Sequence, residues 1–329
     1  MEEKIEKELK WAVLGTGVIA NEMVQALEKM GKKLYAVANR THSKAVEFAK
    51  KYGVEKVYDK IEDMFTDEET DIIYITTPHN THIKFMIEAL KNEKHVLCEK
   101  SITLNSEELE EAVKIAKEKN LILGEAMTIF NMPLYTELSE IVNSGKLGDV
   151  RMIQVNFGSY KEYDMNNRFF NRNLAGGALL DIGVYAISIT RLFMTSKPDN
   201  VLSQVKYAPT GVDEQASIIM MNKEQQMSTI ALTLHSKQPK RVVIACEKAY
   251  IEITEYPRAD KAKIVYTETG EIEEITAGMT ANALQYELQN MEESVKTGIN
   301  KMKLEYTIDV MDIMTKLRKE WGMTYPEEE

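Results

Sequence analysis

The stretch that most constrains the fold is WAVLGTGVIANEM, in which an apolar run from Trp11 to Leu14 meets two glycines and then a helical pattern. This order predicts a strand, a tight turn and the start of a helix. In such a unit Gly15 allows the turn, Gly17 lets a pyrophosphate approach the backbone, and Ala20 lets the helix pack close to the strand. Unpaired amides at the helix N-terminus then face the two phosphates. The stretch predicts a dinucleotide site, although glycines also mark ordinary turns.

The chain alternates between helical and extended patterns after this turn. Apolar spacing and capping signals predict these elements in order: a helix at 18–30, a strand in KLYAVANR, a helix at 43–52, a strand at 56–58, a strand in DIIYITTP, a helix in HNTHIKFMIEALKNEK capped by Asn80, a strand in HVLCEK, a helix capped by Asn105 with Glu108 and ending at Lys119, and a strand at 121–125. Such alternation predicts a doubly wound parallel sheet, the Rossmann arrangement, with its ligand at the carboxyl ends of the strands.

The pattern changes from about Ala126 onwards. It predicts a helix at 134–142, a strand in RMIQVNFG, a helix beginning near Ala175, strands in VLSQVKYA, QASIIMMN, MSTIALTL, RVVIACE, YIEITE and KIVYTE, and helices at 281–297 and 304–321. We therefore expect a dinucleotide-binding domain at 1–124 and an α+β domain at 125–329 with a large, open, mostly antiparallel sheet. Helices are expected to cover only one face of that sheet. Because the other face also needs to be covered, we expect a homodimer or a dimer of dimers.

Charge and cysteine content narrow the choice of partners. The formal net charge of -11 argues against nucleic acid or an anionic membrane, and any anion must be held by a local site. Cys98 and Cys246 are far apart and outside any CxxC spacing, which fits a reducing compartment. The segment MEEKIEKELK is too charged for a signal peptide, and no apolar run approaches bilayer length. We expect a cytoplasmic protein with a small-molecule substrate.

The end of the second strand bears on the choice of cofactor. An NAD site usually offers a carboxylate to the ribose there, whereas an arginine accommodates the 2'-phosphate of NADP. This chain has Asn39 and Arg40, with no acid until Glu47. We therefore expect NADP, with NAD possible, unless Arg40 is only a solvated loop cation. The residues expected to bind the cofactor are Gly15, Gly17, Val18, Ile19, Asn39, Arg40, Thr76, Thr77, Pro78, His82, Glu99 and Lys100.

Two further strand ends locate the chemistry. Thr76, Thr77 and Pro78 end one strand, and Glu99 and Lys100 end the next, so both sets border the nicotinamide half of the dinucleotide. The side chains of Glu99 and Lys100 leave an extended chain on opposite sides. An ammonium there can stabilise charge on a carbonyl oxygen as hydride arrives. The alternative is a surface Glu-Lys pair.

His79 and His82 lie three residues apart but lack a third ligand at a recognisable spacing. We therefore expect no metal, and a capping or cofactor-edge role for these histidines.

The segment RFFNRNLAGGALLDIGVYAI is the informative part of the second half. Gly176 and Gly177 permit close backbone approach, and Asp181 and Tyr185 lie four apart, on one helix face. Beside an ammonium, the Tyr185 hydroxyl is expected to have a lowered pKa and to exchange a proton with the substrate. Asp181 is expected to orient the substrate or hold the lysine. The alternative reading makes both residues structural.

Three separated motifs, the GTGVIA turn, the ThrThrPro and GluLys strand ends, and AGGALLDIGVY, together resemble the Gfo/Idh/MocA oxidoreductases. The likeness covers most of the chain up to about Leu192. It implies a nicotinamide-binding N-terminal domain, an open-sheet C-terminal domain, and hydride exchange with a hydroxyl or carbonyl carbon of a sugar or polyol. It also implies that Lys100 is catalytic or substrate-binding and that Asp181 lies in the active site.

The chain departs from the family pattern at two positions. Ser101 stands where the family commonly has proline after Glu-Lys, which puts the turn that presents Lys100 in doubt. Tyr185 stands where histidine is frequent. A tyrosine there, together with GluAlaMet at 125–127, resembles the dihydrodiol dehydrogenase and NADP-dependent xylose dehydrogenase branch.

These observations predict a metal-free NADP(H)-dependent oxidoreductase that acts on a sugar, polyol or diol. Lys100, Tyr185 and Asp181 are the expected catalytic residues, and Tyr160 and Arg168 the expected substrate contacts. Two alternatives stay open: a non-catalytic NAD(P)-binding sensor, and a glycoside hydrolase that recycles its NAD. Arg40 points away from the hydrolase, because such enzymes resemble NAD binders.

Overall fold

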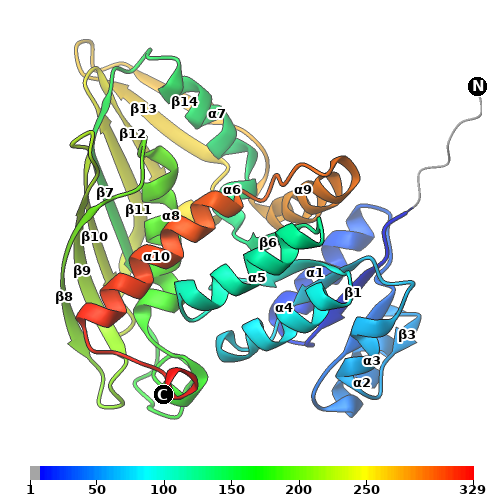
Figure 1. Cartoon of the computed structure of the whole chain (residues 1–329). Coiled ribbons are helices and arrows are strands. Elements are labelled where there is room, and N and C mark those ends of the chain that lie inside the picture. The colour runs from blue at the N-terminus through cyan, green and yellow to red at the C-terminus, as the bar shows by residue number, and fades with distance from the viewer. Residues whose placement is uncertain (1–7) are drawn as a thin grey trace, which may run out of the picture.

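The computed structural model describes residues 8–329; the first seven residues, part of the charged segment considered for a signal peptide, lie outside the described residues. Two sheets stand side by side in Figure 1, a small parallel one at the right and a large one at the left. The helices α8 (Val184–Phe193) and α10 (Leu304–Glu320) lie between them. This arrangement confirms the predicted combination of a Rossmann sheet with a large open sheet.

The parallel sheet has six strands in the order β3-β2-β1-β4-β5-β6. Its elements are β1 (Trp11–Leu14), α1 (Val18–Lys29), β2 (Ala36–Ala38), α2 (His42–Tyr52), β3 (Lys56–Val57), α3 (Ile61–Thr66), β4 (Ile72–Ile75), α4 (His82–Lys91), β5 (His95–Glu99), α5 (Ser106–Glu118) and β6 (Leu123–Ala126). The central strands β1 and β4 are completely buried, as apolar runs covered on both faces should be. The strand order reverses between β1 and β4, which places the ligand crevice at their carboxyl ends.

The two predicted helix caps have different outcomes. The Oδ1 of Asn105 accepts a hydrogen bond from the Glu108 amide at 2.9 Å, as predicted for the start of α5. The prediction for Asn80 is wrong, because Pro78 first starts a short 3₁₀ turn and α4 begins only at His82. The Asn80 side chain instead donates a hydrogen bond to Glu327 near the C-terminus. A long-range partner has replaced the local capping bond.

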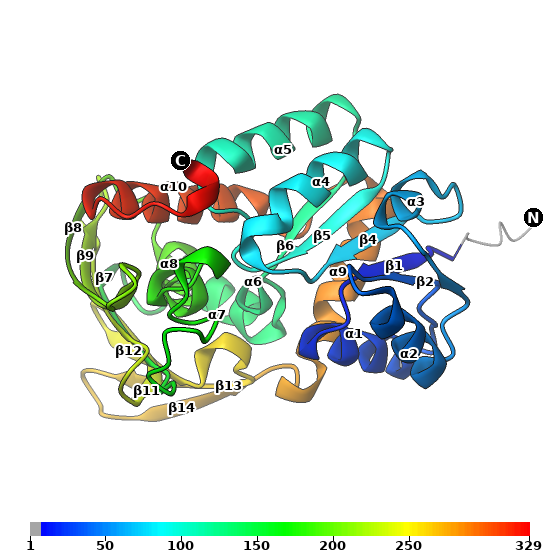
Figure 2. The same ribbon diagram turned by 90° about the horizontal axis from the view of Figure 1, so that it is seen from below.

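The large sheet has eight strands in the order β14-β13-β12-β11-β7-β10-β9-β8, and only the β7–β10 pair is parallel. The remaining elements are α6 (Thr128–Asn131), α7 (Pro133–Asn143), β7 (Val150–Gly158), β8 (Asn200–Tyr207), β9 (Asp213–Met221), β10 (Met227–Thr233), β11 (Gln238–Cys246), β12 (Ala249–Thr254), β13 (Lys261–Tyr266), β14 (Ile272–Thr276) and α9 (Ala283–Thr297). In Figure 2 the helices all lie on one side of this sheet, and no element of the described chain covers its other face.

The helix expected near Ala175 begins a few residues later. Ala175 has a positive φ of 52°, and a π-helical turn at Leu179–Gly183 precedes α8. The segment Arg172–Phe193 has the length and apolar character of a membrane span, but 83% of its apolar 18-residue window is buried inside the fold. Its apolar side chains belong to the protein core.

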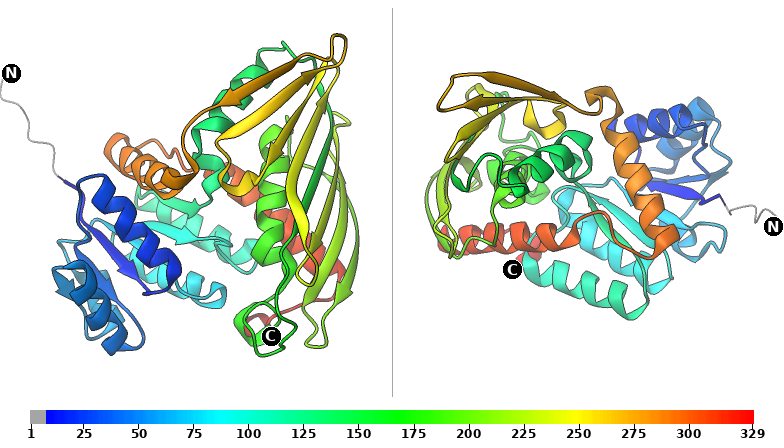
Figure 3. Two further views of the ribbon diagram at one scale, coloured as in Figure 1. Left: turned by 180° about the vertical axis from the view of Figure 1, so that it is seen from behind. Right: turned by 90° about the horizontal axis from the view of Figure 1, so that it is seen from above.

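The terminal helices bind the two halves together. In Figure 3, α9 lies beside α1, and its Leu288 and Met291 join a buried cluster with Trp11 and Val24. Trp11 also donates a 3.0 Å hydrogen bond to Glu292 of α9. The predicted boundary at 124/125 falls inside β6, all of whose residues pair with β5.

Glu125 in β6 is a buried carboxyl that links the halves. Its two oxygens accept hydrogen bonds from the Ile102 amide at 3.1 Å and from the Thr307 hydroxyl of α10 at 3.0 Å. Burial raises its pKa from the ordinary 4.5 to about 7, although these two bonds lower it. The folded protein therefore keeps a proton that the unfolded chain loses, so the free energy of unfolding falls as pH rises from 4.5 to 7.

We predict that Glu125→Gln removes this dependence. Relative to the variant, the wild type should lose on the order of 3 kcal/mol of unfolding free energy across that pH window. Denaturant unfolding of both proteins along the window measures the difference. Asp213, another buried carboxyl whose pKa is raised to about 7, is present in both proteins and cancels. Parallel pH profiles for the two proteins would contradict the prediction.

Candidate active site

The crevice between β1 and β4 begins at Gly15. This residue has a φ of +112°, and a Cβ there would lie 2.5 Å from the Thr76 hydroxyl oxygen. The Thr76 amide donates to the Leu14 carbonyl at 2.9 Å, which holds the two strand ends together. Gly15 is therefore required by the packing of the protein itself. Thr76 stands at the strand end where the sequence placed it.

Gly17 and the start of α1 face open space. A Cβ on Gly17 would meet no atom within 4 Å, and the neighbouring Val18 is 78% exposed although it is apolar. The helix has no side-chain cap and no acidic residue in its first turn. Its free amides suit a phosphate group, and Gly17 leaves room for one to come close. The next residue, Ile19, is half-buried against the core. These residues fit the dinucleotide predicted from the turn.

Asn39 and Arg40 lie beside this turn, at the end of β2. The Asn39 amide donates to the Thr16 hydroxyl at 2.8 Å and its oxygen accepts from the Thr41 amide at 2.8 Å. Asn39 therefore holds the glycine turn against the loop after β2. Arg40 is exposed and has no hydrogen bond or ion pair with another residue of the described part of the chain. Its guanidinium is free to meet a ligand.

His82 joins the strand ends of β4 and β5 from inside. Its Nε2 lies 2.7 Å from the Thr77 carbonyl oxygen and its Nδ1 lies 3.1 Å from the Ser101 carbonyl oxygen. The ring is completely buried, and Pro78, which follows Thr77, is exposed. His82 therefore positions two loops, and its contact with a cofactor stays a prediction.

Glu99 and Lys100 point to opposite sides of β5, as the strand alternation predicts. Glu99 accepts a hydrogen bond from the Tyr74 hydroxyl within the parallel sheet. The Lys100 ammonium instead donates to the Asp181 carbonyl at 2.6 Å and to the Asp181 carboxylate at 3.3 Å. Burial raises the pKa of Glu99, and it therefore holds its proton more readily than an exposed carboxyl.

Ser101 takes over the place of the family proline without loss of the turn. The Lys100–Ser101 peptide bond is cis, and the buried Ser101 hydroxyl donates to the Leu180 carbonyl at 2.9 Å. This bond ties the turn to the same π-helical segment that carries Asp181. The turn still presents Lys100 to Asp181.

Lys100, Asp181 and Tyr185 converge, as the proposed chemistry requires. The Lys100 Nζ lies 4.9 Å from the centre of the Tyr185 ring. Burial lowers the pKa of Lys100, but the Asp181 carboxylate, Tyr185 and Glu99 together outweigh burial, and the pKa is raised. The lysine is therefore a stable ammonium with two protons on Asp181 and a third available. The Tyr185 hydroxyl has no hydrogen-bond partner among residues 8–329.

The expectation of a lowered pKa for Tyr185 is wrong. Burial raises its pKa to about 12, although the Lys100 ammonium lowers it. The ring is half-buried between Lys100 and Phe157, whose ring centre lies 6.1 Å away. Desolvation of the phenolate outweighs the attraction of one lysine. Tyr185 therefore keeps its proton at neutral pH.

The expected substrate contacts come from the loop after β7. Arg168 Nη2 lies 3.6 Å from the Asp181 carboxylate, and Tyr160, 63% exposed, stacks on His235 with ring centres 5.7 Å apart. Gly176 and Gly177 do allow close approach, but the approaching groups are the backbone of this loop at Gly176 and the Asp213 carboxyl at Gly177. A Cβ on Gly176 would lie 2.7 Å from the Arg168 carbonyl oxygen.

Two further residues, His79 and Lys161, lie near the site. His79 was predicted only to cap the helix or border the cofactor, and Lys161 was not predicted. The His79 Nε2 lies 3.1 Å from the Lys100 carbonyl oxygen, and burial lowers the His79 pKa to about 3, so the ring is neutral and supports the turn. Lys161 lies over the Phe169 ring at 4.2 Å. Its position directly after Tyr160 was the only signal for it. In the described chain, residues 8–329, no group of three or more His, Cys, Asp or Glu gathers that could hold a metal.

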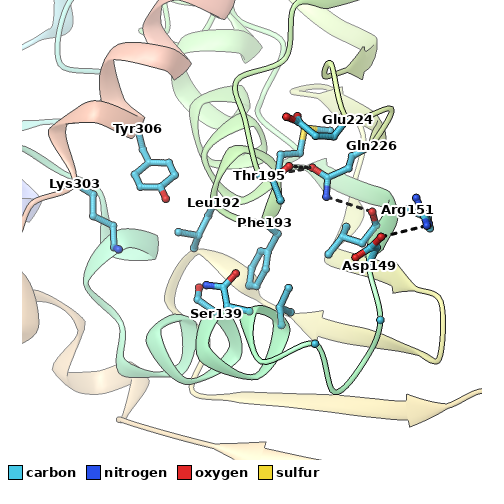
Figure 4. Close-up of a pocket in the computed structure, with 16 residues that line it drawn as sticks. Ser139, Asp149, Arg151, Leu192, Phe193, Thr195, Glu224, Gln226, Lys303 and Tyr306 are labelled. Carbon is cyan, nitrogen blue, oxygen red and sulfur yellow. Dashed lines mark hydrogen bonds and ion pairs between the residues drawn. The ribbon is translucent and has the colours of Figure 1, made fainter.

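A cavity of about 580 Å³ lies elsewhere, among α7, the end of α8 and the start of α10. Figure 4 shows the Gln226 and Thr195 side chains in its wall directed at one another, and Gln226 also donates to the Val150 carbonyl at 3.3 Å. None of the residues expected to react lines this cavity.

We predict that Gly17→Val weakens binding of reduced nicotinamide dinucleotide by at least tenfold, because the side chain fills the space before α1 where a phosphate fits. Stability should hardly change, since the new Cβ meets no protein atom within 4 Å. Fluorescence titration and thermal unfolding measure the two effects. Gly31→Ala, at the opposite end of α1 and with a φ of +73°, should do the reverse and lower stability alone. Equal affinity of the wild type and Gly17→Val would contradict this assignment.

Comparisons with known proteins agree with this geometry. The model of an oxidoreductase family with an NAD-binding Rossmann fold matches residues 9–127, and the model of the GFO/IDH/MocA C-terminal domain matches residues 135–252. The trans-1,2-dihydrobenzene-1,2-diol dehydrogenase of Xenopus laevis is 30% identical over 96% of this chain and 99% of its own length.

Solved structures share the fold at lower identity. A 3-ketoreductase from Actinomadura kijaniata, in complex with NADP and TDP-benzene, is 18% identical with a TM-score of 0.84 over 95% of this chain and 98% of its own. A levoglucosan dehydrogenase in complex with NADH and levoglucosan is 16% identical with a TM-score of 0.82, over 94% and 98% of the two chains. With its glycine turn, its strand-end lysine and matches to both domain models, this chain belongs to the GFO/IDH/MocA oxidoreductase family.

Proposed function

We propose that the protein is an NADP(H)-dependent dehydrogenase or reductase acting on a CH–OH group of a sugar, polyol or diol. The observation that carries the proposal is the meeting of Lys100, Asp181 and Tyr185 at the end of β5, beside the dinucleotide crevice. A relative named as a diol dehydrogenase and neighbours named as a 3-ketoreductase and a levoglucosan dehydrogenase support the substrate class.

Lys100 and Tyr185 act on the reacting oxygen, and Asp181 orients Lys100. Asp181 holds two protons of the Lys100 ammonium, so the third N–H is free to donate to the substrate oxygen and to stabilise developing negative charge. Tyr185, protonated at neutral pH, donates its proton to that oxygen in reduction and takes it back in oxidation. The bound nicotinamide supplies or accepts the hydride.

The exposed Arg40 supports a preference for NADP. Its guanidinium is free at the end of β2, where a 2'-phosphate would lie, and the loop around it holds no carboxylate before Glu47. The 3-ketoreductase neighbour is described with NADP and the levoglucosan dehydrogenase with NADH, so both cofactors are used on this fold.

The test is cofactor-linked turnover across sugars, polyols and diols with NADP and with NAD. We expect Lys100→Met and Tyr185→Phe each to lower kcat/KM by about 10²–10³-fold, since each removes a group that acts on the transition-state oxygen. Lys91→Met and Tyr250→Phe, both exposed and remote, are the matched controls.

Other outcomes would contradict the proposal. Tight cofactor binding without turnover of any substrate would indicate a sensor. Release of a sugar without net change in the cofactor would indicate a hydrolase that recycles its NAD.

We also propose that a second copy of the chain covers the free face of the large sheet and that the protein is cytoplasmic. The outward residues of β7, β9 and β10 alternate with buried ones and include no charged side chain. They are Met152, Gln154, Asn156, Gln215, Ser217, Ile219, Met221, Met227, Thr229 and Ala231. The free cysteines Cys98 and Cys246 support a reducing compartment.

We predict that Ala231→Arg, at the centre of this face, separates the dimer because it would bury an unpaired guanidinium. Light scattering after gel filtration should give twice the 37.6 kDa chain mass for the wild type and the single mass for the variant. Thr66→Arg adds the same charge at an exposed site on α3 and should leave the mass doubled. A monomeric wild type would end this proposal and leave the catalytic one intact.

A further inference from the structure

We propose that the substrate carries an anionic group, a carboxylate or a phosphate, which Lys161 and Arg168 hold on a carbon other than the one that exchanges hydride. The inference rests on the proposed function of the Lys100 site and names the substrate class more closely. The observation behind it is that two positively charged side chains, Lys161 and Arg168, lie near Lys100 without a role in the proposed hydride exchange.

Lys161 and Arg168 both make cation–π contacts with the ring of Phe169. The Lys161 Nζ and the Arg168 Cζ each lie 4.2 Å from the centre of the Phe169 ring. Arg168 also reaches the Asp181 carboxylate at 3.6 Å, and the same oxygen lies 3.3 Å from the Lys100 Nζ. A continuous line of contacts therefore runs from Lys161 to the Lys100 ammonium that binds the reacting oxygen.

This cluster carries more positive charge than the protein neutralises. Lys100 and Arg168 share one carboxylate, Asp181, in a chain whose net charge is -11. The Lys161 ammonium adds a third positive charge, over the Phe169 ring that Arg168 also contacts. Lys161 has no ion pair with a residue in the described range 8–329. Burial lowers its pKa, the Asp181 carboxylate raises it, and the neighbouring arginine lowers it further.

The other charged side chains nearby do not neutralise Lys161 and Arg168. Asp164, on the same loop, accepts hydrogen bonds from the amide and side chain of Asn166 instead. Glu162 is exposed, and no ion pair joins it to either cation. A fourth cation, Lys240, lies 5.3 Å from the centre of the Phe157 ring and pairs with the exposed Glu255 at 3.0 Å. A bound anion would supply the missing negative charge.

The fold holds the two cations in place. The Lys161 amide donates to the Leu234 carbonyl at 2.8 Å, and the Gly177 amide donates to the Phe169 carbonyl at 2.9 Å. Gly176 lacks the Cβ that would collide with the Arg168 carbonyl oxygen. Both side chains are thus anchored through their backbone, one to the end of β10 and the other to the glycine pair before the π-helical turn. An arginine fork next to a lysine suits the oxygens of a carboxylate or phosphate.

The test measures binding separately from turnover. With the reduced cofactor bound, glucose, glucuronate and glucose 6-phosphate are titrated into the enzyme, and the cofactor fluorescence reports binding. We expect at least one of the two anionic sugars to bind at least tenfold more tightly than glucose. Lys161→Met keeps the stem over Phe169 and should weaken that sugar by about tenfold or more, with little effect on glucose. The better of the two anions identifies a carboxylate or a phosphate site.

Lys263→Gln is the control, because it removes a positive charge from an exposed site on β13. Thermal unfolding of each variant checks its folding. Equal binding of charged and neutral sugars, or an equal loss in Lys161→Met and Lys263→Gln, would overturn the proposal. Binding of an anion that needs Lys161, without turnover of any compound, would support this site and reject the catalytic function.

Discussion

The Lys100 ammonium is the group on which the rest of the site depends. It leaves the end of β5 in the parallel sheet and meets Asp181, which belongs to the π-helical turn before α8. A buried ammonium is stable only when it is paired and hydrogen-bonded. The Asp181 carboxylate and carbonyl together supply that pairing, and the ion pair therefore couples the sheet end to the segment that carries Tyr185.

The neighbouring hydrogen bonds and backbone contacts hold the Lys100–Asp181 pair in place. Ser101 bonds the Leu180 carbonyl, and His79 and His82 contact carbonyls of the same turn. Gly176 leaves room for the backbone of the loop after β7, and the Gly177 amide donates to the Phe169 carbonyl, so that Arg168 reaches Asp181. The same carboxylate therefore orients both the Lys100 ammonium, proposed to act on the reacting oxygen, and Arg168, proposed to bind the anion.

Local patterns predicted most of the architecture. The glycine turn, the parallel order and the Asn105 cap depend on bonds within a few residues of one another or on simple periodicity. Asn80 has the same capping side chain but finds Glu327 instead, and a partner so distant in the chain leaves no trace in local spacing. Lys161 left no local signal either, because its ring contact, Phe169, lies later in the same irregular loop and its amide partner, Leu234, comes from another segment.

The sequence by itself determined which residues end the strands, and hence that Gly17, Thr76 and Lys100 face one crevice, because strand direction and strand order follow from local alternation. Only the tertiary structure decided the charge state of Tyr185, the pairing of Arg168 with Asp181 and the placement of Lys161 over the Phe169 ring. Burial and Coulomb interactions depend on what surrounds a group in space, and here the surroundings come from segments far apart along the chain.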